Sequence, residues 1–201
     1  MENLLRNDFT THYGLPACIE PNLAIVTDET YFEIEDTVLR EIAIHTLVGQ
    51  GMARFSNPNA LRITICNYDK FVTCLPNHFQ YGRKRCDIIL VSDVDRYFII
   101  GEIKDSPNVK NHRKKAKKQL LESLTTLIAV PEILVQVNSK VIKRCCYFNK
   151  QTSSPTLINA VTAFNRLTTI FQDGFKMNHL GIEGHNFEFW EYLGGQTLTM
   201  T

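Results

Sequence analysis

The sequence predicts an α/β fold in which a mixed central sheet is flanked by helices. Short runs of alternating apolar and polar residues have the period of a strand, and longer runs with apolar residues three or four positions apart have the period of a helix. These segments follow one another in the order helix, three strands, helix and strand. That order is typical of a sheet whose faces are covered by helices.

The chain is expected to form a single domain over residues 1–201. Its composition, 44% hydrophobic and 21% charged residues, is that of an ordinary globular protein. A chain of this length buries roughly 70% of its unfolded surface, enough for a core without a metal. We expect the core over about residues 30–150, an irregular N-terminal arm with one short helix over 1–29, and an additional helix and strand within 151–201.

The first core helix is predicted from Thr30 onward. Tyr31, Ile34, Val38 and Ile42 recur at helical spacing, acidic residues fall in the first turn, and glycines at 49 and 51 mark the end. The three strands that follow are predicted from their alternation and from the turn residues between them. They cover residues 61–66, 86–91 and 97–104, with a tight hairpin turn at 92–96.

The second half of the chain begins with a predicted helix over residues 110–129, which stops before Pro131. Alternating or β-rich segments then predict strands, and one further apolar period predicts a helix. The expected elements are strands over 133–137 and 141–148, a helix over 157–171 and an edge strand over 187–193.

The overall charge does not direct this protein to a polyanion or a membrane. Lys and Arg number 22 against 21 Asp and Glu, a formal net charge of +1, so basic surfaces must be local. Six cysteines lack metal-binding spacing and fall mostly in apolar runs, so we expect buried free thiols and an intracellular protein. No apolar stretch reaches the roughly 20 residues of a membrane helix, and no membrane partner is expected.

The predicted hairpin brings three chemically active side chains together. Glu102 and Lys104 share one face of their strand because side chains alternate. With the turn centred between Val94 and Asp95, Asp87 lies opposite Glu102, with Cβ atoms roughly 4.5–5.5 Å apart. Two carboxylates so close repel each other unless a cation lies between them.

A hard divalent ion, Mg²⁺ or Mn²⁺, suits this arrangement. Its oxygen ligands would be Asp87, Glu102 and the backbone carbonyl of Ile103. Lys104 could orient an attacking water or stabilise charge on a phosphate. The set is therefore typical of phosphodiester hydrolysis.

Asp87 followed by Glu102-Ile103-Lys104 resembles the motif of the PD-(D/E)XK nuclease superfamily. The resemblance implies a restriction-endonuclease-like αβββαβ core, metal ligation by Asp87 and Glu102, and a catalytic role for Lys104. Cys86 stands where the family name has Pro, which makes the match less specific and leaves the metal chemistry unchanged.

The same resemblance implies a further acidic residue on the preceding helix. Glu41 is similar to that residue, and Glu35 is the alternative. His45, one turn after Glu41, is similar to the added ligand of viral cap-snatching endonucleases, which use the same core.

Two basic clusters, residues 83–85 and 110–118, flank the motif. Such clusters bind phosphates in a salt-dependent and largely sequence-independent way. Lys117 and Gln119 also resemble a basic or amide residue that many family members direct at the active site. The expected nucleic-acid-binding residues are Arg83, Lys84, Arg85, Lys114, Lys117 and Gln119.

The resulting expectation is a Mg²⁺- or Mn²⁺-dependent nuclease that uses water as the nucleophile and acts on DNA in preference to RNA. A nucleic-acid-binding module without turnover, or an interaction scaffold in which residues 102–104 only form a cross-strand ion pair, are the alternatives. The run 110–118 could instead be a nuclear localisation signal. Homodimerisation stays open.

Overall fold

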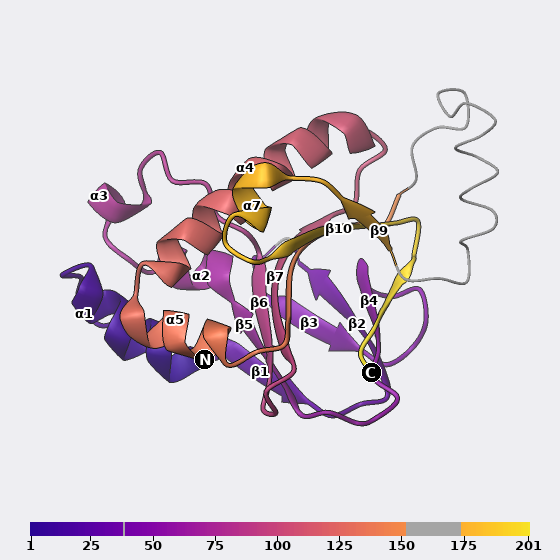
Figure 1. Cartoon of the computed structure of the whole chain (residues 1–201), viewed down its shortest axis with the longest axis horizontal. Helices are drawn as coiled ribbons and strands as arrows, with labels where there is room; N and C mark the ends of the chain where they lie inside the picture. The colour runs from indigo at the N-terminus through magenta and orange to yellow at the C-terminus, as the bar shows by residue number, and fades with distance from the viewer. Residues whose placement is uncertain (38, 152–173) are drawn as a thin grey trace.

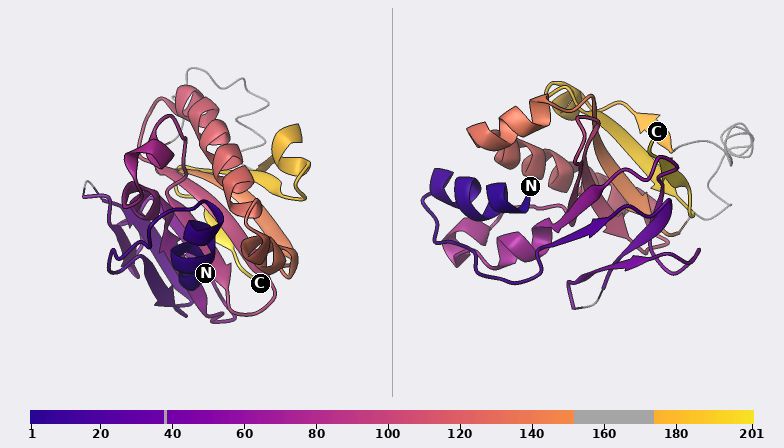
Figure 2. Two further views of the ribbon diagram at one scale, coloured as in Figure 1. Left: turned by 90° about the vertical axis from the view of Figure 1, so that its left-hand side faces the viewer. Right: turned by 90° about the horizontal axis from the view of Figure 1, so that it is seen from below.

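The computed structural model describes residues 1–37, 39–151 and 174–201. Within these ranges a seven-stranded sheet has helices on one face and a four-stranded sheet on the other (Figures 1 and 2). Each interface contains its own cluster of buried apolar side chains. The expected α/β class, with a large mixed sheet and flanking helices, is confirmed. The second sheet was not expected.

The large sheet contains the predicted hairpin. Its described strands are, in spatial order, β1 (Ala24–Thr27), β5 (Ile63–Asn67), β6 (Ile88–Ser92), β7 (Tyr97–Lys104), β8 (Ile142–Asn149), β10 (Glu188–Leu193) and β9 (Phe175–Met177). Neighbours are antiparallel except for β7 with β8 and β8 with β10, which are parallel. The strands expected at 61–66, 86–91, 97–104 and 141–148 are therefore present, with small shifts at their ends.

The hairpin register agrees with the prediction. Ile88 pairs with Gly101, and the Asp87 N–H donates to the Gly101 carbonyl at 3.1 Å. Continuing that register places Asp87 next to Glu102. The turn is closed by Ser92, whose hydroxyl oxygen accepts the Tyr97 N–H at 2.8 Å.

Helix α4 (Val109–Ile128) confirms the helix expected at 110–129 and crosses one face of the large sheet (Figure 1). The strand expected at 133–137 is wrong, because these residues belong to helix α5 (Pro131–Asn138). Pro131 occupies the first turn, where a missing N–H has no cost. Ile133 and Val137, four residues apart, are its buried face, and that spacing is helical.

The helix expected from Thr30 is also wrong. Residues 31–36 and 42–45 form strands of the second sheet, whose spatial order is β11 (Thr197–Thr199), β4 (Ala53–Ser56), β2 (Tyr31–Asp36) and β3 (Ile42–His45). In the sequence, apolar residues at positions 34, 38 and 42 are four residues apart. This spacing fits a helix, but it also fits a strand, because side chains two or four positions apart lie on the same face of a strand. Burial of Phe32 and Ile34 against the large sheet decides the outcome.

The N-terminal arm is more ordered than expected. A π-helical segment, η1 (Leu4–Phe9), continues into α1 (Thr10–His12) and buries Leu5 and Phe9. Three further short helices are described, namely α2 (Tyr68–Thr73), α3 (Asn77–Gln80) and α7 (Leu180–Glu183).

The expectation of free thiols fails for two of the cysteines. Cys18 and Cys74 form a disulfide that joins the arm to the end of α2, with their Cα atoms 6.1 Å apart. A disulfide partner 56 residues away leaves no trace in local spacing. Cys66, Cys86 and Cys145 are buried thiols, as expected.

The strand expected at 187–193 is present as β10, but β9 pairs with its outer side, so it is not an edge strand. The helix expected at 157–171 lies outside the described residues. Within the described ranges, no single helix has the length and apolar character needed to cross a membrane.

Candidate active site

Asp87 lies immediately before β6 and accepts hydrogen bonds from three backbone N–H groups. Its carboxylate oxygen Oδ2 accepts the Ile103 N–H at 2.6 Å, and its backbone carbonyl accepts the N–H groups of Tyr68 and Asp69 at the start of α2. Asp87 is buried, with 8% of its solvent-accessible surface exposed. The side chain therefore has a defined direction at the end of the hairpin.

Glu102 and Lys104 lie on the same face of β7, as alternation requires. The Lys104 ammonium is 2.7 Å from Glu102 Oε1 and 3.5 Å from Asp87 Oδ2. Glu102 is fully buried, and in the described part of the chain neither of its carboxylate oxygens has a hydrogen bond of regular geometry. The three predicted residues are brought together as expected.

Electrostatics at this cluster oppose ionisation of the acids. Burial raises the pKa of Asp87 to about 6, although Lys104 and the Ile103 N–H act in the opposite direction. Burial, and then the charge of Asp87, raise the pKa of Glu102 well above its usual value. Burial alone would lower the pKa of Lys104, but the two carboxylates raise it above its ordinary value. The acids therefore need cationic partners to be ionised together.

The cluster opens into a cavity of about 790 Å³ with a strongly basic rim. Four of the predicted nucleic-acid-binding residues that line it are basic, and Gln119 is the fifth. The lining consists of Asp36, Arg40, Asp69, Arg83, Lys84, Arg85, Asp87, Lys104, Lys114, Lys115, Lys118 and Gln119. A lining that combines carboxylates with many cations suits a phosphate substrate that approaches a metal.

Helix α4 holds the basic segment that leads into β6. Gln119 Nε2 donates to the Arg85 carbonyl at 2.9 Å, and the Cys86 N–H donates to Ser123 Oγ at 2.8 Å. Gln119 also lowers the pKa of Glu102, but by less than burial and the charge of Asp87 raise it. The predicted role of Gln119 near the site is thus matched by its position.

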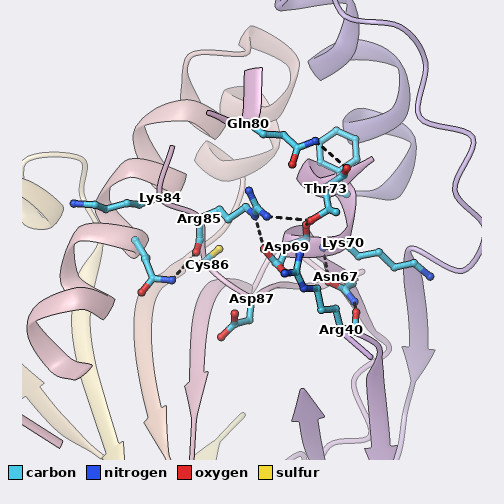
Figure 3. Close-up of polar contacts among 12 residues, drawn as sticks. Arg40, Asn67, Asp69, Lys70, Thr73, Gln80, Lys84, Arg85, Cys86 and Asp87 are labelled. Atoms are coloured by element: carbon cyan, nitrogen blue, oxygen red, sulfur yellow. Dashed lines mark hydrogen bonds and ion pairs between the residues drawn. The ribbon is translucent and has the colours of Figure 1, made fainter. Parts of the chain in front are cut away.

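Arg85 is further oriented by α2. Figure 3 shows its guanidinium directed at Asp69 and at Thr73, with which it forms an ion pair and a hydrogen bond of 3.1 Å. Contacts with α2 and α4 therefore fix the position of Arg85, two residues before Asp87.

Two acidic residues of the cavity escaped the sequence analysis. Asp36 ends β2, and Asp69 lies in the first turn of α2. Burial raises the pKa of Asp36, Lys104 lowers it and Asp69 raises it, so these charges are close to one another. A usable signal was the position of Asp69 two residues after Asn67, whose side chain caps α2.

Three other expectations about the site are not met. Glu41 lies in the turn between β2 and β3, not on a helix, and pairs with Lys70 at 2.7 Å outside the cavity. Glu35, its alternative, pairs with His45 at 2.9 Å. Glu35 and His45 pair because β2 and β3 form a hairpin, whereas Glu41 pairs with a lysine of α2.

Lys117 does not line the cavity either. Its ammonium lies over the Phe189 ring, 5.2 Å from the centroid. Lys114 and Lys118 lie on the cavity side of the same helix. A basic run on a helix spreads over all its faces, and contact with the sheet decides which members reach the site.

A divalent ion fits the chemistry of Asp87 and Glu102, since both supply oxygen ligands and the buried Glu102 carboxylate lacks regular hydrogen bonds to any residue that the structure describes. Among the described residues, no three His, Cys, Asp or Glu side chains gather closely enough to form a complete metal site. Mg²⁺ retains several water ligands, so two carboxylates are an adequate protein contribution.

Comparison with known proteins adds no assignment: no protein-family model, curated protein or solved structure matches this chain.

Proposed function

We propose that this protein is a metal-dependent nuclease of the PD-(D/E)XK type that hydrolyses phosphodiester bonds in DNA, in preference to RNA. One observation carries the proposal: Asp87, Glu102 and Lys104 meet at the end of the β6–β7 hairpin, where Asp87 and Lys104 line a basic cavity and Glu102 is buried beside them. The parallel pairing of β8 with β7 after helix α4 also agrees with a restriction-endonuclease-like core.

Asp87 and Glu102 are the residues that would hold Mg²⁺ or Mn²⁺. Such an ion supplies Lewis-acid stabilisation and an activated water molecule. It would also offset the repulsion between the two buried carboxylates. In the free protein, the Lys104 ammonium is the cation beside both of them.

Lys104 keeps its proton near neutral pH, because Asp87 and Glu102 outweigh the effect of burial on its pKa. It therefore acts as a cation: it stabilises negative charge that develops on the phosphate and orients the attacking water. Basic residues on the cavity rim bind the flanking phosphates and hold the substrate across the site.

The test is incubation of the purified protein with plasmid, single-stranded DNA and RNA in Mg²⁺, Mn²⁺ or EDTA. Cleavage is expected with either metal, and is expected to be lost in EDTA and in Asp87→Ala and Lys104→Ala. Asp93→Ala and Lys176→Ala are matched controls, because both side chains are more than half exposed and lie outside the cavity. Binding of nucleic acid without cleavage by the parent protein would indicate a binding module, and absence of both would indicate a scaffold.

A further inference from the structure

A row of polar side chains crosses the large sheet beneath α4. Glu102 on β7 pairs with Tyr147 on β8, and Tyr147 pairs with Glu191 on β10. Paired positions on neighbouring strands direct their side chains to the same face. Asp87 adjoins the row on the β6 side.

The far end of this row is an ion pair. Glu191 is 2% exposed, and its Oε1 accepts a 2.5 Å hydrogen bond from Arg113 Nε, on α4. The near end is the Glu102–Lys104 pair. Tyr147 therefore lies between two carboxylates that each have a cation beside them.

Tyr147 itself is fully buried, and in the described part of the chain its hydroxyl has no hydrogen-bond partner. Buried tyrosine hydroxyls usually have one, because a buried polar group without a partner destabilises the folded protein. Burial, and then Glu191, raise the pKa of Tyr147 to about 12, so the hydroxyl remains a donor. An unsatisfied donor thus adjoins Glu102, whose oxygens also lack regular hydrogen bonds.

We infer that Tyr147 is a positioning residue for Glu102: its hydroxyl donates to the Glu102 carboxylate when that carboxylate holds a metal ion and Lys104 has left it. In the free protein the Lys104 ammonium lies 2.7 Å from Glu102 Oε1, and among the described residues neither Glu102 Oε2 nor the Tyr147 hydroxyl has a hydrogen-bond partner. This inference rests on the proposed nuclease function. It assigns Tyr147 no contact with the substrate.

The experiment is Tyr147→Phe, which removes one oxygen atom. Three quantities are measured: the midpoint of thermal unfolding, Mn²⁺ affinity by calorimetry without nucleic acid, and the cleavage rate. Because the hydroxyl has no partner among residues 1–37, 39–151 and 174–201, the midpoint is expected to stay equal or rise. Mn²⁺ affinity and the cleavage rate are each expected to fall by about tenfold or more, as for other groups that orient a metal ligand.

Tyr97→Phe is the matched control. Tyr97 is also buried on the large sheet, but its hydroxyl donates to the Thr201 carbonyl at 3.0 Å and accepts the Thr201 N–H at 2.7 Å. This variant is expected to unfold at a lower temperature and to keep the parent's Mn²⁺ affinity and cleavage rate. The two variants should therefore show opposite patterns.

The inference is overturned if Tyr147→Phe binds Mn²⁺ and cleaves like an active parent protein, which leaves the nuclease proposal intact. It is also overturned if Tyr147→Phe unfolds at a lower temperature, because the hydroxyl would then have a structural partner. If the parent protein neither binds Mn²⁺ nor cleaves, the nuclease proposal and this inference both fall.

Discussion

Asp87 Oδ2 accepts the backbone N–H of Ile103 at 2.6 Å, and the same oxygen lies 3.5 Å from the Lys104 ammonium. One carboxylate atom thus joins the start of β6 to the end of β7 and approaches the cation of the site. The strand pairing that builds the hairpin also orients the acid, so the site needs no separate loop to position it.

Asp87→Asn is expected to stabilise the protein at high pH and to abolish cleavage. The amide oxygen can still accept the Ile103 N–H. The pKa of Asp87 rises from 3.8 to about 6 on folding, so the folded protein binds a proton more tightly than the unfolded chain, and the free energy of unfolding falls as the pH rises from about 4 to about 6. The gain at pH 8 is about 3 kcal/mol, at roughly 1.4 kcal/mol per pH unit.

Urea unfolding of Asp87→Asn and the parent protein at pH 4, 6 and 8 measures this gain. The difference should be small at pH 4 and should grow with pH. Asp93→Asn, at a half-exposed turn position outside the cavity, is the control. A variant less stable than the parent at pH 8 would contradict the argument from burial.

Asp36→Asn is expected to weaken Mn²⁺ binding by about tenfold, the usual effect of removing an outer-sphere group. Asp36 lines the cavity close to Lys104 and can reach a bound ion through a water ligand. Glu41→Gln should leave the affinity unchanged, because Glu41 pairs with Lys70 outside the cavity. Calorimetric titration with Mn²⁺ compares the two, and an equal loss in both would refute the distinction.

The double variant Lys114→Gln/Lys118→Gln is expected to weaken DNA binding and reduce its salt dependence. Both side chains line the cavity. Each lost phosphate contact lowers the slope of log affinity against log salt by roughly 0.9 on duplex DNA. Fluorescence anisotropy in EDTA at several salt concentrations measures the slope.

Arg62→Gln/Lys176→Gln removes the same charge elsewhere, since neither residue lines the cavity. It should retain the parent's salt slope. If both double variants lose the same slope, net charge rather than this cavity governs binding.

Reduction of the Cys18–Cys74 disulfide is expected to destabilise the protein by about 4 kcal/mol, the chain-entropy value for a loop of this length. Cys18→Ser/Cys74→Ser should be destabilised similarly. Alkylation of the denatured, unreduced protein followed by peptide mass spectrometry should leave Cys18 and Cys74 unlabelled. Labelling of both would show that the disulfide is absent.

Local pattern was sufficient for the hairpin and its chemistry. The turn at 92–96 sets the pairing of β6 with β7, so the meeting of Asp87, Glu102 and Lys104 could be predicted from spacing alone. The helical period of α4 and the break before Pro131 were equally local. The same kind of pattern gave a wrong prediction for residues 31–45. Their apolar spacing fits both the helical and the strand period, and packing against the large sheet selects the strand.

Long-range contacts decided everything else about the site. The pairing of Tyr147 with Glu102 joins parallel strands that are separated in the sequence by two helices, α4 and α5, and no turn sets such a register. The same holds for Asp36, which belongs to the other sheet, and for Lys117, whose ammonium lies over Phe189 because α4 packs across β7 and β8, beside β10. Contacts between distant segments depend on how the completed core packs, and a linear pattern carries no record of that packing.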